Sequence, residues 1–267
     1  MIARHGRTAA ILVAGLALLA LVAWRAGASA VHYASDPSHE PCPAVTPGDH
    51  MVSIPTPAGP RPVLLHASRA AYMPRPLVIA LPGADPTTYS PMASRENFLV
   101  AYPSGSGITG GQLLDRLEAS LCVNKAEVYV AGGATAARLA CELSSRLAAV
   151  AVMSDGRTLH ACRPARPLPV LAIHGATTPR NRASVEQWLA HWRHIDGCRG
   201  LAKRIVPGPG VSETVWRHCA AGTRVEDVQV GRAAGAWPHA PRTVQAAAAW
   251  RVWQLFRTLP PRGPTRS

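Results

Sequence analysis

The amino-acid sequence predicts an α/β fold of three layers, in which a mostly parallel sheet with an N-terminal hairpin carries helices on both faces. Short continuous apolar runs, such as residues 77–81, are typical of strands that are buried on both faces. These runs alternate with segments whose apolar residues recur at helical spacing. A hydrophobic content of 48% in 267 residues is sufficient for one large core. Together these observations indicate a single α/β domain over residues 50–259.

The first elements form a predicted hairpin followed by two buried strands. Residues 50–54 and 61–67 have strand character, and the Pro- and Gly-rich segment 55–60 between them is a turn signal. The apolar runs 77–81 and 98–102 follow, and each ends at a proline. Because strands buried on both faces belong to the interior of parallel sheets, we expect these two runs near the centre of the sheet.

The remaining elements alternate between helix and strand. Residues 112–121 are predicted to form a helix, because Leu113, Leu117 and Leu121 fall on one stripe. A strand over 127–131 leads through a Gly-Gly turn into a small-residue helix over 136–146. Further strands are predicted at 148–153, 169–174 and 223–230, and further helices at 184–196 and 244–258.

The turn between residues 128 and 137 has the layout of a nucleophile elbow. In that motif, G-x-S-x-G, a sharp strand-to-helix turn exposes a serine. The corresponding residues here are Gly132-Gly133-Ala134-Thr135-Ala136. Alanine has no oxygen with which to attack a substrate, so the motif has lost its nucleophile. The neighbouring Thr135 carries a hydroxyl, but we expect that hydroxyl to cap the start of the helix.

Residues 50–259 resemble the secreted polyhydroxybutyrate depolymerase and feruloyl esterase-like group of α/β-hydrolases. The resemblance implies a three-layer α/β-hydrolase fold, an ancestral carboxylic ester hydrolase activity and no cofactor. It rests on several stretches in matching order: 75–81, 98–103, 121–123, 139–143, 166–175 and 236–238.

The same resemblance locates the three positions of a catalytic triad. Enzymes of this group need a serine, an aspartate and a histidine in that chain order. The corresponding positions here hold Ala134, Thr178 and Gly235. Loss of one triad member reduces the turnover of a serine hydrolase by about 10⁴ to 10⁶. We therefore expect a catalytically inactive, esterase-like protein.

The loop that would bind the oxyanion is altered as well. The resemblance identifies Gly83, Ala84 and Thr135 as remnants of this site. Asp85 would bring a negative charge close to a developing oxyanion, which is the wrong sign for stabilising it.

An active ester hydrolase with a relocated triad is the alternative reading, and a copy without a selected role is a third. Residues that could line the cleft are Asp85, Asp155, His174, Trp237 and His239. Each polar member also has a structural explanation. Asp155 suits a turn, His239 a surface position, and His174 a structural role at the end of a strand.

The N-terminus is predicted to be a targeting segment. Arg4 and Arg7 precede the uncharged apolar stretch 9–24, and Ala28-Ser29-Ala30 has the form of a cleavage site. Residues 1–30 are thus a signal peptide or, because Arg25 follows the apolar stretch closely, an uncleaved anchor. A Pro-rich arm over 31–49 and a tail over 260–267 flank the domain, and we expect a secreted or cell-envelope protein.

Export gives meaning to the six cysteines, because disulfides form in oxidising compartments. The sequence alone allows many pairings, and buried thiols remain an alternative for Cys122 and Cys141. No cysteine or histidine spacing is typical of zinc sites, so we expect no metal. The placement of the predicted elements favours three pairs: Cys198 with Cys219, Cys141 with Cys162, and Cys42 with Cys122.

The formal charge of +13 does not indicate a nucleic-acid-binding protein. Nearly all of the positive charge is arginine, scattered without the basic cluster or aromatic ladder that such surfaces need. The expected partner is a hydrophobic or carbohydrate ester ligand, or a component of the cell envelope. Contact with a membrane is expected only through the N-terminal segment, if it stays uncleaved.

Overall fold

The computed structural model describes residues 45–56, 59–68, 73–82, 84–104, 109–154, 159, 162–175, 178–208, 210–231 and 241–260. The chain divides into residues 1–41 and 42–267, and every described residue belongs to the second unit. None of the described helices is both long enough and apolar enough to span a membrane. Several predictions lie outside the described residues: the signal peptide, most of the N-terminal arm, the tail after residue 260, and Cys42, Gly83, Asp155, Gly235, Trp237 and His239.

The described residues form a ten-stranded sheet in the order β1-β2-β4-β3-β5-β6-β7-β10-β9-β8. Strands β4, β3, β5, β6, β7 and β10 run parallel, while antiparallel pairs, β1–β2 and β9–β8, lie at the two edges. The strands are β1 (Gly48–Ile54), β2 (Arg61–Ala67), β3 (Arg75–Ala80), β4 (Leu99–Pro103), β5 (Val123–Gly132), β6 (Ala149–Met153), β7 (Val170–His174), β8 (Lys203–Gly208), β9 (Val211–Trp216) and β10 (Val225–Val230).

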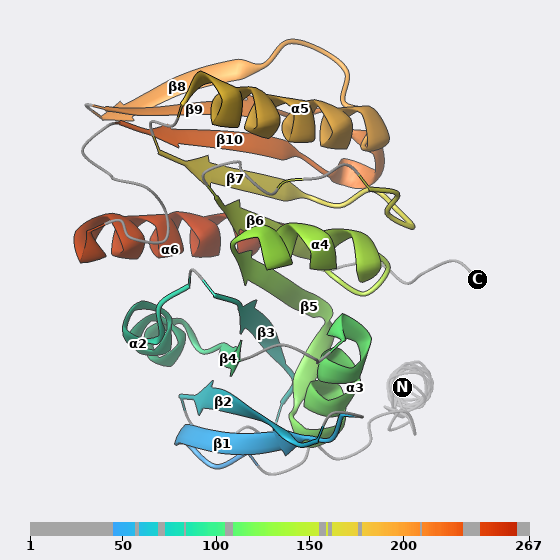
Figure 1. The fold of residues 1–267 in the computed structure, drawn as a ribbon, viewed down its shortest axis with the longest axis vertical. Helices are drawn as coiled ribbons and strands as arrows, with labels where there is room; N and C mark the ends of the chain where they lie inside the picture. Colours follow the sequence, from blue (N-terminus) through green and yellow to red (C-terminus); the bar gives the residue numbers. More distant parts are fainter. Residues whose placement is uncertain are drawn as a thin grey trace, which may run out of the picture. The chain divides into compact units, whose positions relative to one another are not determined.

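Helices cover both faces of this sheet (Figure 1). Along β5, Val128 and Val130 pack with α3, α4 and α5, while Tyr129 and Ala131 pack with α2 and α6. Successive side chains of a strand point to opposite faces, so one central strand contributes to both cores. The predicted three-layer α/β fold is confirmed. The helices are α2 (Pro86–Glu96), α3 (Gly110–Ser120), α4 (Ala134–Glu142), α5 (Pro179–Ile195) and α6 (Arg242–Phe256).

Helix α2 and both strands of the hairpin β8–β9 had no counterpart in the sequence analysis. Helix α2 contains Pro91, which obscured its helical pattern, although Asp85 caps it and Pro86 begins it. The hairpin β8–β9 lies at the sheet edge, and one of the two buried positions of β9 is Glu213, so its sequence has no clear apolar alternation. Two helix boundaries differ from the predicted ones. Helix α4 ends at Glu142 rather than at residue 146, and α5 begins at Pro179 rather than at residue 184.

Two of the predicted disulfides are present. Cys141 of α4 is bonded to Cys162, which precedes β7, and Cys198 after α5 is bonded to Cys219. Cys122 is disulfide-bonded too, while its predicted partner lies outside the described residues. None of the cysteines within the described ranges is free, so the buried-thiol alternative for Cys122 and Cys141 is wrong.

Candidate functional site at the turn after β5

The turn between β5 and α4 is held close to the end of β3. Gly132 has φ +154°, and a Cβ atom at this position would lie 2.7 Å from the Cβ of Leu81. The backbone N–H of Gly133 donates a hydrogen bond of 3.1 Å to the carbonyl oxygen of Pro82. The two glycines therefore allow the segments that follow β3 and β5 to meet backbone against backbone.

Ala134 is the first residue of α4 and is half-buried. The described non-glycine residues with positive φ are Asn97, His218 and Ala221, so Ala134 does not have a left-handed backbone. The positive φ of the turn falls on Gly132 instead. The backbone turn of the elbow is present, but the residue at its apex is unstrained and carries only a methyl group.

Thr135 does not cap the helix, and the expectation that it does is wrong. The N-cap of α4 is Gly133, which makes no side-chain capping bond. Thr135 is the second residue of the helix and is exposed to solvent. Its backbone N–H belongs to the first turn, whose N–H groups have no acceptor within the helix.

The residues predicted to be a remnant of the oxyanion loop make local hydrogen bonds. The N–H of Ala84 donates to the carbonyl oxygen of Leu81 at 2.9 Å and closes a turn. Asp85 is the N-cap of α2: its Oδ1 accepts from the N–H of Thr87 at 2.9 Å, and its Oδ2 accepts from the Thr87 hydroxyl at 2.7 Å. Both groups stabilise the start of α2, and the Ala84 donor is not free to bind an oxyanion.

Thr178, which the sequence analysis assigned to the position of the acid, is also a helix cap. Its Oγ1 accepts a hydrogen bond of 3.3 Å from the N–H of Asn181, and Pro179 follows as the first residue of α5. This arrangement is a favourable helix start, because threonine is a good N-cap and proline suits the first turn. It leaves no carboxylate at this position to orient an imidazole.

His174 lies at the end of β7 beside a carboxylate that sequence reasoning missed. Its Nε2 is 2.8 Å from Oδ1 of Asp227 on the neighbouring strand β10. Only 5% of the His174 side chain is exposed, and its buried Nδ1 has no hydrogen-bond partner. The consecutive acids Glu226 and Asp227 within strand β10 were the available signal.

This pair has a defined proton arrangement. A carboxylate only accepts, so Nε2 of His174 carries the proton toward Asp227, and Nδ1 is the free acceptor. An imidazole at the carboxyl end of β7 and a carboxylate in the middle of β10 are therefore in place. No hydroxyl of the described residues is hydrogen-bonded to Nδ1. Among these residues, no group of three histidine, cysteine or acidic side chains is arranged to hold a metal ion.

Solved esterase structures have the same fold. A thermostable carboxylesterase from a metagenomic library, EstE1, superposes with a TM-score of 0.52 at 11% identity, covering 82% of this chain and 91% of that chain. A structure of an arylesterase gives 0.51 at 8% identity, with 82% and 87% covered. This chain has an α/β-hydrolase fold.

Sequence comparison adds a weaker relationship. A bifunctional acetylxylan esterase/xylanase of Neocallimastix patriciarum is 24% identical over 207 residues, which is 66% of this chain. The match spans only 30% of that protein's length. No family model matches the chain. At this identity the relationship supports an esterase-like fold and does not show an activity.

Proposed function

We propose that this chain is an exported, esterase-like protein that does not hydrolyse esters at the turn after β5. The observation that supports the proposal is Ala134, a methyl group at the apex of an otherwise intact strand–turn–helix. Covalent ester hydrolysis requires an oxygen or sulfur nucleophile there, activated by a neighbouring base. The scaffold of an esterase has thus kept its turn without the attacking atom.

Two further observations support the absence of ester hydrolysis at the carboxyl ends of the parallel strands. Thr178 caps α5 where an acid would orient the base, and the N–H of Ala84 is engaged with Leu81. A hydrolase that lacks its triad keeps about 10³ to 10⁴ of rate enhancement, chiefly from its oxyanion hole and substrate binding. Because the Ala84 donor is engaged too, hydrolysis at this turn is expected to stay near the uncatalysed rate.

The proposal includes a binding role outside the cytoplasm. Disulfides persist in oxidising compartments, and the pairs Cys141–Cys162 and Cys198–Cys219 are compatible with such a location. The ligand classes that we propose are a hydrophobic or carbohydrate ester and a component of the cell envelope. The only support for these ligand classes is the retained esterase-like fold. Because a fold does not decide function, the binding role needs an experimental test.

One observation favours a second candidate, an ester hydrolase with a relocated centre at the same edge. The His174–Asp227 pair has the imidazole and the carboxylate of a base and its orienting acid. Its Nδ1, buried without a partner, is available to accept a proton.

The experiment that separates these candidates is a turnover assay with p-nitrophenyl acetate and butyrate on wild type and on His174→Gln. The proposal is contradicted if the wild type hydrolyses these esters and the His174→Gln variant loses that turnover. The binding role predicts that xylan fragments or lipids raise the melting temperature without being consumed. No shift with any of these ligands would contradict the binding role.

A further inference from the structure

The hairpin β1–β2 and helix α2 bring a hydroxyl, an imidazole and a carboxylate together away from the turn after β5. Asp49 of β1 and His66 of β2 are directly opposite each other across the two strands. Nδ1 of His66 lies 2.6 Å from Oδ1 of Asp49. On its other side, Nε2 of His66 lies 2.8 Å from Oγ of Ser94, which belongs to α2. We call these three residues the Ser94 relay.

The Ser94 relay lies at the amino ends of the parallel strands, whereas the turn after β5 lies at their carboxyl ends. We call these two sides of the sheet the amino edge and the carboxyl edge. His66 is paired with Val100, the second residue of β4, so the relay is near the amino end of that strand. The Gly132–Ala134 turn follows the carboxyl end of β5. Since β4, β3 and β5 run in the same direction, the two sites occupy different edges of one sheet. The relay is therefore independent of the proposed function of the carboxyl edge.

Hydrogen-bonding chemistry fixes the direction of proton transfer in the relay. The Asp49 carboxylate only accepts, so Nδ1 of His66 is the protonated nitrogen when the imidazole is neutral. The lone pair on Nε2 then accepts the hydroxyl proton of Ser94. This order of acid, imidazole and hydroxyl is the arrangement by which a serine is activated in hydrolases.

The relay is accessible to solvent at the hydroxyl end. Ser94 is exposed, and 12% of the His66 side chain and 59% of the Asp49 side chain are exposed. The imidazole is largely shielded by its neighbours, while the attacking oxygen remains in contact with solvent. A structural link alone does not require the free nitrogen of the histidine to meet an exposed hydroxyl.

We propose that Ser94 is an activated nucleophile that accepts acyl groups from small activated esters. The Ser94 Oγ attacks the carbonyl carbon of the ester while its proton passes to Nε2 of His66. The bond from carbon to the leaving oxygen then breaks, and that oxygen takes the proton from His66. A water molecule, deprotonated in the same way, releases the acid and restores Ser94.

The substrate class follows from the surroundings of Ser94. The backbone N–H at this position lies in the last turn of α2 and is bonded within the helix, so it forms no oxyanion hole. The rate enhancement therefore comes from general base catalysis, which is typically about 10²- to 10⁴-fold. Esters with good leaving groups, such as p-nitrophenyl or other aryl esters, suit a nucleophile of this kind.

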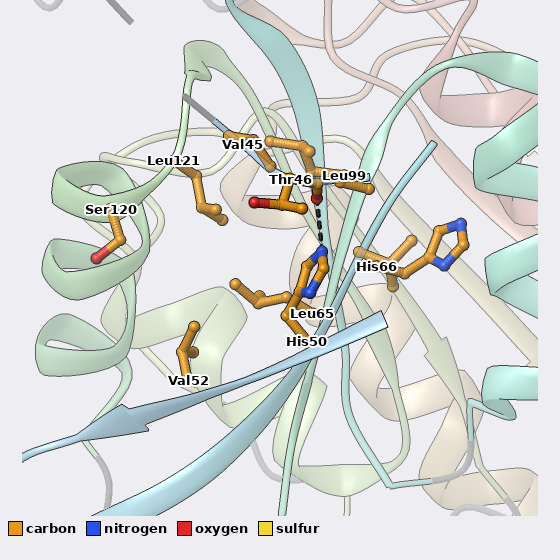
Figure 2. Close-up of a pocket in the computed structure, with 11 residues that line it drawn as sticks. Val45, Thr46, His50, Val52, Leu65, His66, Leu99, Ser120 and Leu121 are labelled. Carbon is orange, nitrogen blue, oxygen red and sulfur yellow. Dashed lines mark hydrogen bonds between the residues drawn. The ribbon is translucent and has the colours of Figure 1, made fainter. Parts of the chain in front are cut away.

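A nearby pocket belongs to the other face of the hairpin. Its volume is about 150 Å³, and its lining includes His50, Val52, Leu65 and part of His66. His50 pairs with Leu65 in the register, whereas His66 pairs with Asp49, so these two pairs point to opposite faces. Figure 2 shows the imidazole of His66 directed away from the other labelled side chains. Substrates of Ser94 consequently approach from the α2 side.

The test measures the rate of covalent labelling of the full chain by a fluorophosphonate probe. The wild type is expected to be labelled at Ser94. Ser94→Ala should lose the label, and His66→Gln should react about 100-fold more slowly. Ser90→Ala is the matched control, because Ser90 lies one turn earlier and is bonded to the Tyr102 hydroxyl at 2.9 Å.

Mapping of the label by peptide mass spectrometry keeps the test independent of any variant's folding. A wild-type protein without an adduct on Ser94 would overturn the proposal, as would an unchanged rate in folded His66→Gln. An adduct at the carboxyl edge, near Ala134 or His174, would instead contradict the proposed inactivity of that edge.

Discussion

The two edges of the sheet differ in what they have kept. At the carboxyl ends of the parallel strands, Gly132 and Gly133 form a tight strand-to-helix turn, but Ala134 and Thr178, the predicted positions of nucleophile and acid, carry neither group. At the amino edge, Ser94 and His66 are hydrogen-bonded in the order of a catalytic relay, but on an ordinary helix and hairpin. Catalysis needs reactive groups and the backbone that positions them and the oxyanion. The carboxyl edge has the backbone turn without the reactive groups, and the amino edge has the reactive groups without such a backbone.

Asp196→Asn should produce the largest change in the free energy of unfolding. The carboxyl group of Asp196 is buried near the amino ends of the strands. It accepts a hydrogen bond from the N–H of Leu168, while burial raises its pKa from 3.8 to about 7. From pH 4 to 7 the unfolded chain releases this proton and the folded chain retains it, so the free energy of unfolding falls as pH rises. This pKa difference corresponds to about 4 kcal/mol.

The measurement is urea unfolding of wild type and Asp196→Asn between pH 4 and pH 8. Asparagine resembles the protonated acid, so the two proteins should be equally stable near pH 4. The variant should then become more stable than the wild type as pH increases. Parallel stability curves over this range would show that Asp196 does not titrate between the two states.

Gly132→Ala tests whether the backbone of the carboxyl edge depends on close contact. The new methyl group would lie 2.7 Å from Cβ of Leu81, and the residue would keep a φ that alanine rarely adopts. We expect a loss of about 2–4 kcal/mol in unfolding free energy. Gly111→Ala in α3 is the control, because its Cβ would meet nothing within 4 Å. Equal stabilities of the two variants would contradict this explanation of the turn.

His66→Gln tests the reactive groups of the amino edge in a turnover assay. With p-nitrophenyl acetate, the variant should lose about 100-fold in hydrolysis, which corresponds to removal of a general base. Ser90→Ala should behave like the wild type, because its hydroxyl is bonded to Tyr102 and not to the imidazole. A variant that keeps wild-type turnover would show that the imidazole does not activate Ser94.

Ala134→Ser should have the smallest effect of these changes. A serine hydroxyl would be restored at the apex of the turn, yet the backbone there is unstrained and Thr178 cannot orient a base. We expect no gain in ester turnover over the wild type. An increase of more than about tenfold would mean that the carboxyl edge still contains a competent base.

The sequence predicted those parts of the molecule that depend on local patterns. The continuous apolar residues of β3 and β6 identify central strands, because strands that are buried on both faces have near-continuous apolar sequences. The Gly-Gly turn between β5 and α4 was also predicted, because it is a local pattern of residues. Cys198 and Cys219 were paired correctly because their elements end near each other.

The Ser94 relay was not predictable, because its members meet only through tertiary structure. His66 and Asp49 are 17 residues apart, and His66 and Ser94 are 28 residues apart. Their contact requires the register of β1 on β2 and the placement of α2, a helix that Pro91 concealed. Asp227 was missed for a similar reason, since its role depends on the pairing of β10 with β7.

The most direct test of the contrast between the two edges is identification of the residue that reacts with a fluorophosphonate in the wild-type protein. Peptide mass spectrometry should find the adduct on Ser94 and none on the residues that follow β5, β6 or β7. An adduct on a residue of the carboxyl edge would show that a nucleophile survives there and would contradict the account.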